Sequence, residues 1–328
     1  MDKNLDELFR IFLSIKKAEG KADSTIAQYK QNYRYFTDYL DKCDIERNFA
    51  ELNKTIFRNY ISFMREDMVK FANHAYKTDR ERTVGLSPST INTRMKTLRT
   101  IFRCLYEEEI TDSNPIQGVK NIPNPLENID ILTSDELTKL LKVPNRKSFA
   151  GYRDLTLTHL LLDGMMRISE AINLKINNFD LKNNSVTIPA SIAKSRKTRT
   201  LPLQPVTVRM IKRLIEINED FNSGYVFLTN YGERISRDHY RKRLNDYAKQ
   251  AKITKNIHPH LLRHTAATLF LEDGGDIRHL QLLLGHADLR MVLRYTHPSK
   301  KSLEEQSTKH SVINRVSDKL SRPRKTKI

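Results

Sequence analysis

The sequence predicts a mainly α-helical protein of two domains, an N-terminal helical bundle followed by a mixed α+β domain with a small antiparallel sheet. Its 328 residues suit about two domains. Apolar side chains recur every three or four residues over most of the chain, which is the period of an amphipathic helix. In the second half, two short runs rich in β-branched residues flank a basic turn, which is typical of a strand pair.

The first predicted domain, residues 1–118, consists of helices joined by polar turns. Asp23 or Ser24 is expected to cap a helix that starts nearby. Pro88 suits the first turn of a later helix, because its missing N–H has no partner there anyway. The apolar spacing supports four or five helices in all. In one of them the recurring side chains are Ile26, Tyr29, Tyr33, Phe36 and Leu40.

Residues 119–130 are rich in proline and asparagine and are predicted to be a linker. The second predicted domain, residues 131–328, opens on a helix start with the character of a capping box at Thr133 and Glu136. A helix is then expected through 152–175. The first short strand, the basic turn and the second strand are expected, in that order, at 185–188, 193–197 and 199–203.

The positive charge of the chain is concentrated in its second half. Lys and Arg number 57 against 39 Asp and Glu, a net charge of +18. Residues 1–118 hold 20 basic and 18 acidic side chains, which leaves 37 and 21, or +16, for residues 119–328. This asymmetry predicts a polyanionic partner, most often nucleic acid. The alternative is a basic surface without a partner.

Several classes of protein are disfavoured by composition. No run of about 18 apolar residues is present, so no membrane partner is expected. The first 20 residues alternate charged with apolar side chains, unlike a secretory signal peptide. The two cysteines, Cys43 and Cys104, form no paired framework. A cytoplasmic protein is therefore expected rather than a secreted disulfide scaffold or a cysteine zinc finger.

The basic half carries five short motifs whose residue types suit phosphate chemistry. Alone, none of them is specific, because an R-x-S-E string or an H-x-x-R helix turn often arises by chance. Their order and spacing together are specific. They are Gly164–Glu170 with Arg167 inside it, Lys194 in the basic turn, His260–His264 with Arg263 inside it, Leu284-Gly285-His286, and Tyr295.

With these motifs the chain resembles the tyrosine recombinases of the phage integrase family, from about residue 10 to residue 297. Ser24-Thr25-Ile26-x-x-Tyr29 and Ser89-Thr90-Ile91-Asn92 also look like the helical DNA-binding domain of that family. The resemblance implies that a tyrosine attacks a DNA phosphodiester and forms a 3′-phosphotyrosyl bond. Because this bond keeps the energy needed for rejoining, neither a cofactor such as ATP nor a metal ion is required.

The resemblance also assigns roles. Arg167 and Arg263 hold the non-bridging oxygens of the scissile phosphate, His260 transfers a proton with the nucleophile, Lys194 protonates the 5′-oxygen leaving group, His286 donates a hydrogen bond to the phosphate, and Tyr295 is the nucleophile. Arginine suits its role because its planar fork matches two phosphate oxygens and its charge does not titrate. Glu170 is expected to support the fold or the position of Arg167 rather than to react.

Each of these residues has rivals in the sequence. Spacing alone does not separate His260 from His258 and His264; the match to the family's His-x-x-Arg pattern favours His260. The remaining rivals share a turn or a residue type with the favoured residue. They are Arg196, Lys197 and Arg199 for Lys194, and Tyr231, Tyr240 and Tyr247 for Tyr295.

The sequence departs from the family pattern without losing a catalytic side chain. Met165 stands where a glycine is usual, which is expected to alter the turn before Arg167. Ala193 and Ser195 flank Lys194 where a glycine is usual, and residues 65–86 look like an insertion. An active enzyme is therefore expected.

The expected partner is double-stranded DNA at recombination sites, clamped between the two domains. The resemblance implies a homotetramer in the synaptic complex and allows an accessory DNA-bending factor. Val312, Val316 and Leu320 in the tail 309–328 predict a short amphipathic helix, which either docks on a neighbouring protomer or is part of a disordered basic end.

Two biological roles and two other classes of protein are compatible with the motifs. Integration and excision of a mobile element is favoured, and Xer-like resolution of DNA dimers is the alternative. A non-catalytic DNA-binding regulator would share the architecture. A metal-dependent nuclease or hydrolase could be built around His258, His260 and His264, of which His260 and His264 lie four residues apart and could bind zinc, but no carboxylate lies in that turn.

Overall fold

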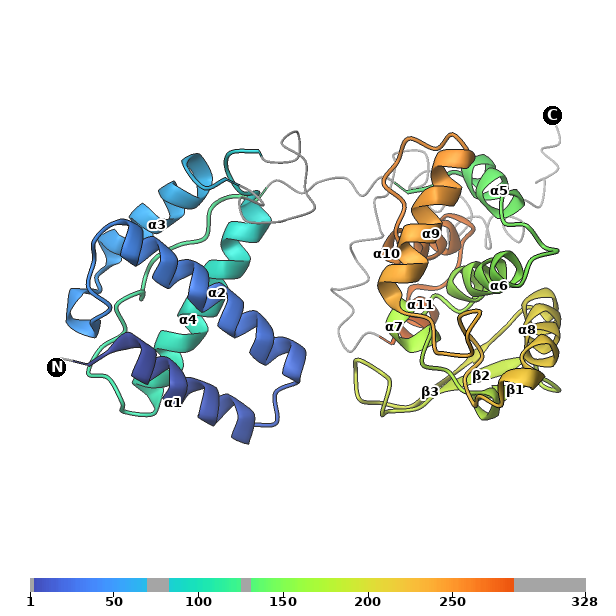
Figure 1. Ribbon diagram of the computed structural model, residues 1–328, viewed down its shortest axis with the longest axis horizontal. Helices are drawn as coiled ribbons and strands as arrows, with labels where there is room; N and C mark the ends of the chain where they lie inside the picture. The colour runs from blue at the N-terminus through green and yellow to red at the C-terminus, as the bar shows by residue number, and fades with distance from the viewer. Residues whose placement is uncertain (1–2, 70–82, 125–130, 286–328) are drawn as a thin grey trace, which may run out of the picture. The chain divides into compact units, whose positions relative to one another are not determined.

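The computed structural model describes residues 3–69, 83–124 and 131–285. The chain divides into two compact units, here called unit 1 (residues 1–127) and unit 2 (residues 128–328). Among the described residues, unit 1 is helical and unit 2 combines helices with one three-stranded sheet (Figure 1). The predicted fold class is therefore confirmed.

Unit 1 is built around one long helix that contacts three others. Aromatic side chains fill the space between the helices: the rings of Phe36 and Phe57 stack with centroids 5.4 Å apart, and Tyr60 meets Phe36 edge-on at 5.3 Å. Stacked and edge-to-face pairs add to the stabilisation that burial gives. The elements are α1 (Leu5–Ala18), α2 (Asp23–Lys42), the 3₁₀ turn η1 (Phe49–Glu51), α3 (Lys54–Glu66) and the central α4 (Pro88–Glu107).

The helix starts of unit 1 test the capping predictions. Pro88 occupies the first turn of α4, as predicted, and the Ser87 side chain accepts a hydrogen bond from the Thr90 N–H. The predicted cap of α2 is wrong. The helix starts at Asp23, and Ala22 precedes it without a side-chain cap. Asp23 lies in the first turn instead, where its negative charge interacts favourably with the helix dipole.

Unit 2 packs its helices on one another and on a small antiparallel sheet, whose strand order is β1-β2-β3 with Val186 opposite Leu201. The predicted capping box is confirmed, since Thr133 and Glu136 exchange hydrogen bonds with each other's backbone. The elements are α5 (Ser134–Lys142), α6 (Phe149–Asp163), α7 (Ile168–Ala171), η3 (Ile176–Asn178), β1 (Phe179–Asp180), β2 (Ser185–Ile188), β3 (Arg199–Pro202), α8 (Pro205–Ile217), η4 (Glu219–Phe221), α9 (Arg237–Gln250), α10 (Pro259–Glu272) and α11 (Ile277–Leu284).

The helix predicted through 152–175 is wrong in its length, because α6 ends at Asp163. Met165 has φ +45°, a left-handed conformation that no α-helix contains. The chain turns there and starts the short α7 after Arg167. The break separates α6, which is buried on several sides against α8 and α10, from the residues of the candidate site.

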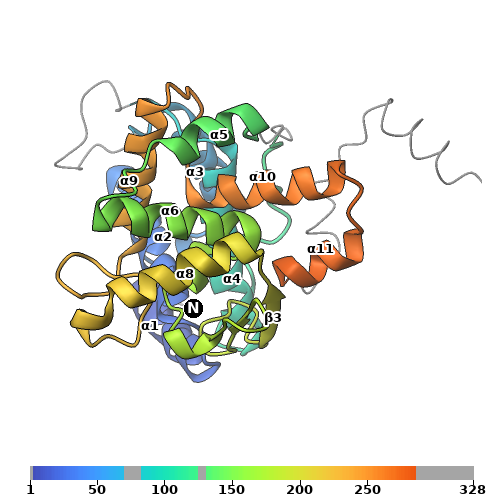
Figure 2. The ribbon, with the colours of Figure 1, turned by 90° about the vertical axis from the view of Figure 1, so that its right-hand side faces the viewer.

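The last described helices extend the core of unit 2. The main core gathers side chains from α6, the sheet, α8 and α9. α11 contacts α10 and lies beside its C-terminal end (Figure 2). A second, smaller cluster joins α10 and α11 through Ala267, Leu280 and Leu284, together with Met165 from the turn.

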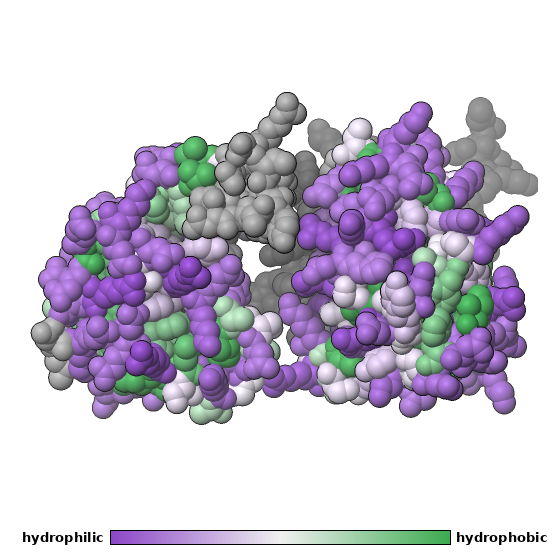
Figure 3. All heavy atoms as spheres, in the orientation of Figure 1, coloured by the Kyte–Doolittle hydropathy of each residue, from purple (hydrophilic) through white to green (hydrophobic). Residues whose placement is uncertain are grey.

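The surface agrees with the basic, polar composition. Hydrophilic side chains cover most of the visible face of each unit (Figure 3). Within the described residues, no helix has the length and hydropathy needed to span a bilayer. Much of the predicted insertion 65–86 and the predicted tail helix 309–328 lie outside the described residues.

Candidate active site

Arg167 begins the candidate site at the end of the turn that follows α6. It is the N-cap residue of α7, and its side chain is 16% exposed. Its backbone N–H donates to Glu170 Oε2 at 3.0 Å, and its Nη1 donates to Glu170 Oε1 at 3.2 Å. A single carboxylate therefore fixes both the backbone and the guanidinium of Arg167.

Glu170 also binds a second arginine, which comes from the sheet. Arg199 in β3 donates from Nη2 to Oε2 at 2.7 Å and from Nη1 to Oε1 at 3.3 Å. Burial by itself raises the pKa of Glu170, but hydrogen bonds from Arg199 and Arg167 outweigh it and hold that pKa below its usual value. Glu170 is thus an anion between two cations. This confirms that it supports Arg167, and it places Arg199 in a structural pair rather than beside Lys194.

Arg263 joins three segments of unit 2 through its guanidinium. It lies on α10 and is 4% exposed. Nη1 donates to the carbonyl oxygen of Met165 and Nη2 to that of Leu284, each at 2.7 Å. These bonds use two of its five N–H donors. They hold the plane of the guanidinium between the turn before Arg167 and the last residue of α11.

His260 lies on α10 one turn before Arg263, on the same side of the helix. Partial burial lowers its pKa, and the positive charges of His258, Arg263, Arg167 and Lys194 lower it further. These charges come from α10, from the start of α7 and from the β2–β3 turn. Four of the six predicted site residues therefore lie close enough to influence one another. The His260 imidazole is favoured in its neutral form at neutral pH.

The structure distinguishes the three competing histidines. His258 is the N-cap residue of α10, and its Nδ1 accepts a hydrogen bond from the Leu261 N–H at 3.1 Å. Its ring centroid lies 6.4 Å from that of His260. His264 is half-buried one turn further along α10. Among residues 3–69, 83–124 and 131–285, no three His, Cys, Asp or Glu side chains are grouped as they would be around one metal ion.

Lys194 lies in the turn between β2 and β3 and is exposed. The strands on either side are paired in register, with Ile188 opposite Arg199. Outside the ladder, the Ala190 N–H donates to Thr198 Oγ1 at 3.1 Å. This pairing places Lys194 in a hairpin turn near His260. Arg199, at the base of the same hairpin, is bound to Glu170.

Gly285 ends α11 directly against Arg199. Its φ of +61° is left-handed, and a Cβ placed there would lie 2.9 Å from Cζ of Arg199. Glycine suits this conformation and leaves room for the guanidinium of Arg199. His286 and Tyr295, the other two predicted site residues, lie outside the described residues.

The tyrosines that compete with Tyr295 differ in exposure. Tyr240 is fully buried and shares a hydrogen bond with Thr158, and burial raises its pKa. Tyr247 donates to Asp154 at 2.8 Å, and burial raises its pKa to about 12. Both hydroxyl groups are engaged in the core. Tyr231 is 91% exposed.

Comparison with protein families identifies the chain. Residues 130–302 match the phage integrase family, and residues 4–122 match the phage integrase SAM-like domain. The chain belongs to the phage integrase family. It is a tyrosine recombinase, an enzyme of site-specific DNA recombination, as the sequence analysis expected.

Curated relatives and solved structures agree with this assignment. Tyrosine recombinase XerD of Listeria monocytogenes is 28% identical over 309 residues, which cover 92% of this chain and 96% of the relative. Tyrosine recombinase XerC of Yersinia pestis is 29% identical over 277 residues, covering 79% and 88%. The Tn1549 transposon integrase in complex with transposon right end DNA has the same fold, with a TM-score of 0.72 at 17% identity, covering 92% of this chain and 98% of that one. The XerH site-specific recombinase bound to palindromic difH substrate has a TM-score of 0.69 at 23% identity, covering 93% of this chain and 84% of that one.

Beside the candidate site, the recombinase has a basic pocket that the sequence analysis missed. It has a volume of about 350 Å³ and is lined by Ile168 of α7 and by residues of α9 and the start of α10. Arg237 and Arg241 come from α9, and His258 and His260 from α10. The positive charge of Arg241 contributes to a lowered pKa of His258, after partial burial. Two arginines four residues apart on one helix were the available sequence signal.

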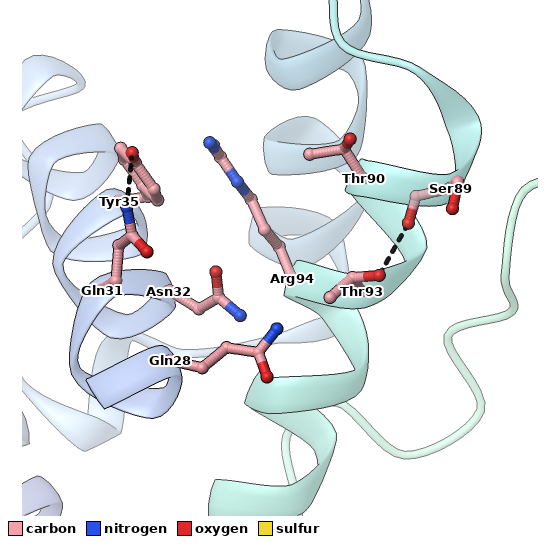
Figure 4. A pocket seen from close by; sticks show the side chains of 8 residues that line it. All are labelled: Gln28, Gln31, Asn32, Tyr35, Ser89, Thr90, Thr93 and Arg94. Atoms are coloured by element: carbon pink, nitrogen blue, oxygen red, sulfur yellow. Dashed lines mark hydrogen bonds between the residues drawn. The ribbon is translucent and has the colours of Figure 1, made fainter. Parts of the chain in front are cut away.

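Unit 1 of the recombinase holds a second polar pocket, between α2 and α4 (Figure 4). Arg94 is 8% exposed, and its guanidinium carbon lies 3.7 Å from the centroid of the Tyr35 ring. The amide of the buried Asn32 donates to Thr97 Oγ1 at 2.8 Å, so its nitrogen is already engaged. The side chains that line the pocket are Gln28, Gln31, Asn32, Tyr35, Ser89, Thr90, Thr93 and Arg94.

Proposed function

We propose that the recombinase cuts and rejoins DNA with Tyr295 as nucleophile, assisted by Arg167, Lys194, His260, Arg263 and His286. The observation that carries the proposal is that Arg263 donates to the carbonyl of Met165, two residues before Arg167, and that His260 lies one turn before Arg263 on α10, where the charges of Arg263, Arg167 and Lys194 lower its pKa. These side chains come from three separate segments and bring several positive charges to one surface of unit 2. That surface suits a phosphate group.

The charge arrangement suits the transition state of phosphodiester attack. The phosphorane gains negative charge on its non-bridging oxygens, and preorganised donors stabilise that charge without reorganising. Glu170 neutralises one of the two arginines that it binds, so the cluster keeps an excess of positive charge. Arg263 is held by two backbone carbonyls, so its orientation is set before DNA arrives.

The lowered pKa of His260 supports one of the proposed proton transfers. The Tyr295 oxygen attacks phosphorus, its proton passes to the neutral His260, and the bond from phosphorus to the 5′-oxygen breaks. Lys194 gives a proton to that oxygen. A 3′-phosphotyrosyl bond and a free 5′-hydroxyl result. Attack by the 5′-hydroxyl of another strand reverses these steps and rejoins the DNA. A lowered pKa suits His260 to the role of base, since its acceptor nitrogen is available at neutral pH.

The partner in this proposal is double-stranded DNA at recombination sites. Residues 1–118 and 131–328 act as the two halves of a clamp joined by the linker 119–130. The pocket beside His260, with Arg237 and Arg241, offers charge to phosphates that flank the cleaved bond. The pocket of unit 1 offers amide and hydroxyl groups. A homotetramer on two sites would complete the synaptic complex, and an accessory DNA-bending factor would be an additional partner.

Covalent capture tests this proposal. In EDTA, a nicked duplex carrying a recombination site should leave a denaturation-resistant adduct with wild-type protein and none with Tyr295→Phe. Tyr231→Phe is the matched control, because Tyr231 is 91% exposed and lies outside the cluster; it should form the adduct at the wild-type rate.

Other outcomes of the same experiment would overturn the proposal. Specific DNA binding without an adduct from either protein would indicate a regulator. Cleavage that requires a divalent metal and survives Tyr295→Phe would indicate a nuclease.

Two biological roles fit this chemistry. Integration and excision of a mobile element is our first proposal. Resolution of DNA dimers is the second, because curated XerD and XerC relatives align over most of this chain. A plasmid assay separates them. Dimer resolution requires recombination between two directly repeated identical sites, whereas integration requires recombination between an element end and a different target sequence.

A further inference from the structure

Met165 combines two properties that rarely occur together. Its φ of +45° lies in the left-handed region, which a side chain with a Cβ adopts at a cost, and it is 7% exposed. Among the described residues, six others that are not glycine have positive φ: Asp44, Glu109, Asn184, Arg196, Asn222 and Lys252. Each of these is a polar or charged residue, whereas Met165 is a buried apolar one. Strain of this kind persists where the surroundings hold it.

The backbone of Met165 is held by the candidate site itself. Its carbonyl oxygen accepts the Nη1 hydrogen bond of Arg263 at 2.7 Å, while Nη2 of the same guanidinium binds the carbonyl of Leu284 at the end of α11. The left-handed turn at Met165 stands two residues before Arg167. One residue thus links the segment that presents Arg167 to the guanidinium of Arg263.

The side chain of Met165 makes the same connection through packing. It belongs to the small cluster formed with Ala267 on α10 and with Leu280 and Leu284 on α11. Met166, the next residue, belongs to the main core of unit 2 instead. Met165 is the member of the small cluster that comes from outside the α10–α11 pair. It therefore ties α11 to the turn that carries Arg167.

We infer that Met165 is a positioning residue that keeps the end of α11 in register with Arg167 and Arg263. The inference rests on the proposed function, since it gives the chain after Gly285 a role in the reaction. The left-handed backbone aims the carbonyl at Arg263, and the buried thioether holds α11 against the turn. A glycine at position 165 would keep the backbone turn but lose the tie to α11.

The variants that test this inference separate backbone from side chain. Met165→Gly removes the packing and relaxes the backbone, and Met165→Leu keeps a similar apolar volume. Leu214→Ala is the matched control. It removes a fully buried side chain from α8 in the main core of the same unit, away from the cluster.

Three measurements are made on each full-length protein: the rate of covalent adduct formation in a single turnover, the DNA affinity, and amide hydrogen exchange in 277–285. For Met165→Gly we expect at least a tenfold lower adduct rate, an affinity within twofold of wild type, and faster exchange in α11. Met165→Leu should restore the rate to within about threefold. Leu214→Ala should lower the melting temperature without slowing the adduct rate of the folded protein.

The outcomes separate this inference from the proposed function. A wild-type adduct rate in Met165→Gly, or an equal loss in Leu214→Ala, would overturn the positioning role. Unchanged exchange in α11 would overturn the tie itself. If wild-type protein forms no adduct while α11 still loosens in Met165→Gly, the proposed function fails and the tie remains.

Discussion

Glu170 and Asp154 are both fully buried carboxylates of unit 2, and each contacts two arginine side chains. Asp154 accepts from Arg153 at 2.9 and 2.7 Å on one oxygen, and from Arg243 and Tyr247 on the other. Arg153 is itself only 1% exposed. This network joins α6 to α9 around two almost fully buried side chains, Arg153 and Asp154, and Arg243 forms its outer edge with 31% of its side chain exposed.

The cluster around Glu170 differs in its neighbours rather than in its exposure. Arg167 and Arg199 keep 16% and 11% of their side chains exposed, less than Arg243, but Arg167 contributes to the charge felt by His260. The Asp154 network thus joins two helices of the scaffold, while the Glu170 cluster fixes an arginine of the candidate site. Similar residues act as scaffold or as support for a site according to what lies next to them.

The largest effect should come from a substitution at Asp154, which disrupts its network with Arg153 and Arg243. Asp154→Asn keeps the shape but removes the negative charge that Arg153 and Arg243 share. Leaving a buried charge without its partner costs about 3–5 kcal/mol, so urea unfolding should show a loss of that order. The protein that remains folded should form the adduct at the wild-type rate. A loss below about 1 kcal/mol would mean that the network contributes little.

Glu170→Gln should have a smaller effect on stability and a larger one on activity. Neither of its arginines is as deeply buried as Arg153, the partner of Asp154, so we expect the free energy of unfolding to fall by about 1–3 kcal/mol. Arg167 loses its fixed position, so adduct formation should slow at least tenfold. The measurements are urea unfolding and the single-turnover rate. A wild-type rate in this variant would separate Glu170 from the site.

The pH dependence of stability gives Glu170 a second test. Its pKa is lowered in the folded protein, so its ion pairs stabilise the fold fully above the ordinary pKa of 4.5. That contribution is lost as the pH falls through the lowered folded pKa. Glu170→Gln should therefore flatten the acid limb of the stability profile. An unchanged limb would contradict the ionised state of Glu170.

Local patterns predicted most of the elements of this fold. The apolar spacing located the helices of unit 1, Ser87 and Pro88 marked the start of α4, and two β-branched runs located the β2–β3 hairpin. Such features depend on residues close together in sequence. The cap of α2 and the end of α6 were mispredicted: Ala22 precedes α2 without a side-chain cap, and the left-handed turn at Met165 follows the end of α6.

The side chains of the candidate site were predicted from motif order, but their couplings were not. Glu170 meets Arg199 across 29 residues, and Asp154 meets Tyr247 across 93. Such pairs depend on how whole elements pack, which no periodicity records. His258 and His260 were equivalent by spacing, and only the family's His-x-x-Arg pattern favoured His260; the capping hydrogen bond of His258 at the start of α10 was not predicted.

The smallest expected effect concerns His260, which lies near Arg167 of the Glu170 cluster. Partial burial and neighbouring cations lower its pKa, and His258 is the first of those cations. If neutral His260 accepts the proton of the nucleophile, the adduct rate should stay level from pH 8 down past the ordinary value of 6.5 and fall only in more acidic solution.

His258→Asn keeps a side chain that can cap α10 but removes a titratable positive charge. The midpoint of the acid limb should therefore move upward in this variant, measured as the single-turnover rate against pH. A midpoint above 6.5 in the wild type, or one that His258→Asn leaves unmoved, would mean that another group controls the acid limb. Asp154→Asn is the control for this prediction, with the rates compared at equal folded fraction. It should leave the midpoint unchanged, because Asp154 contacts neither His260 nor the residues that shift its pKa.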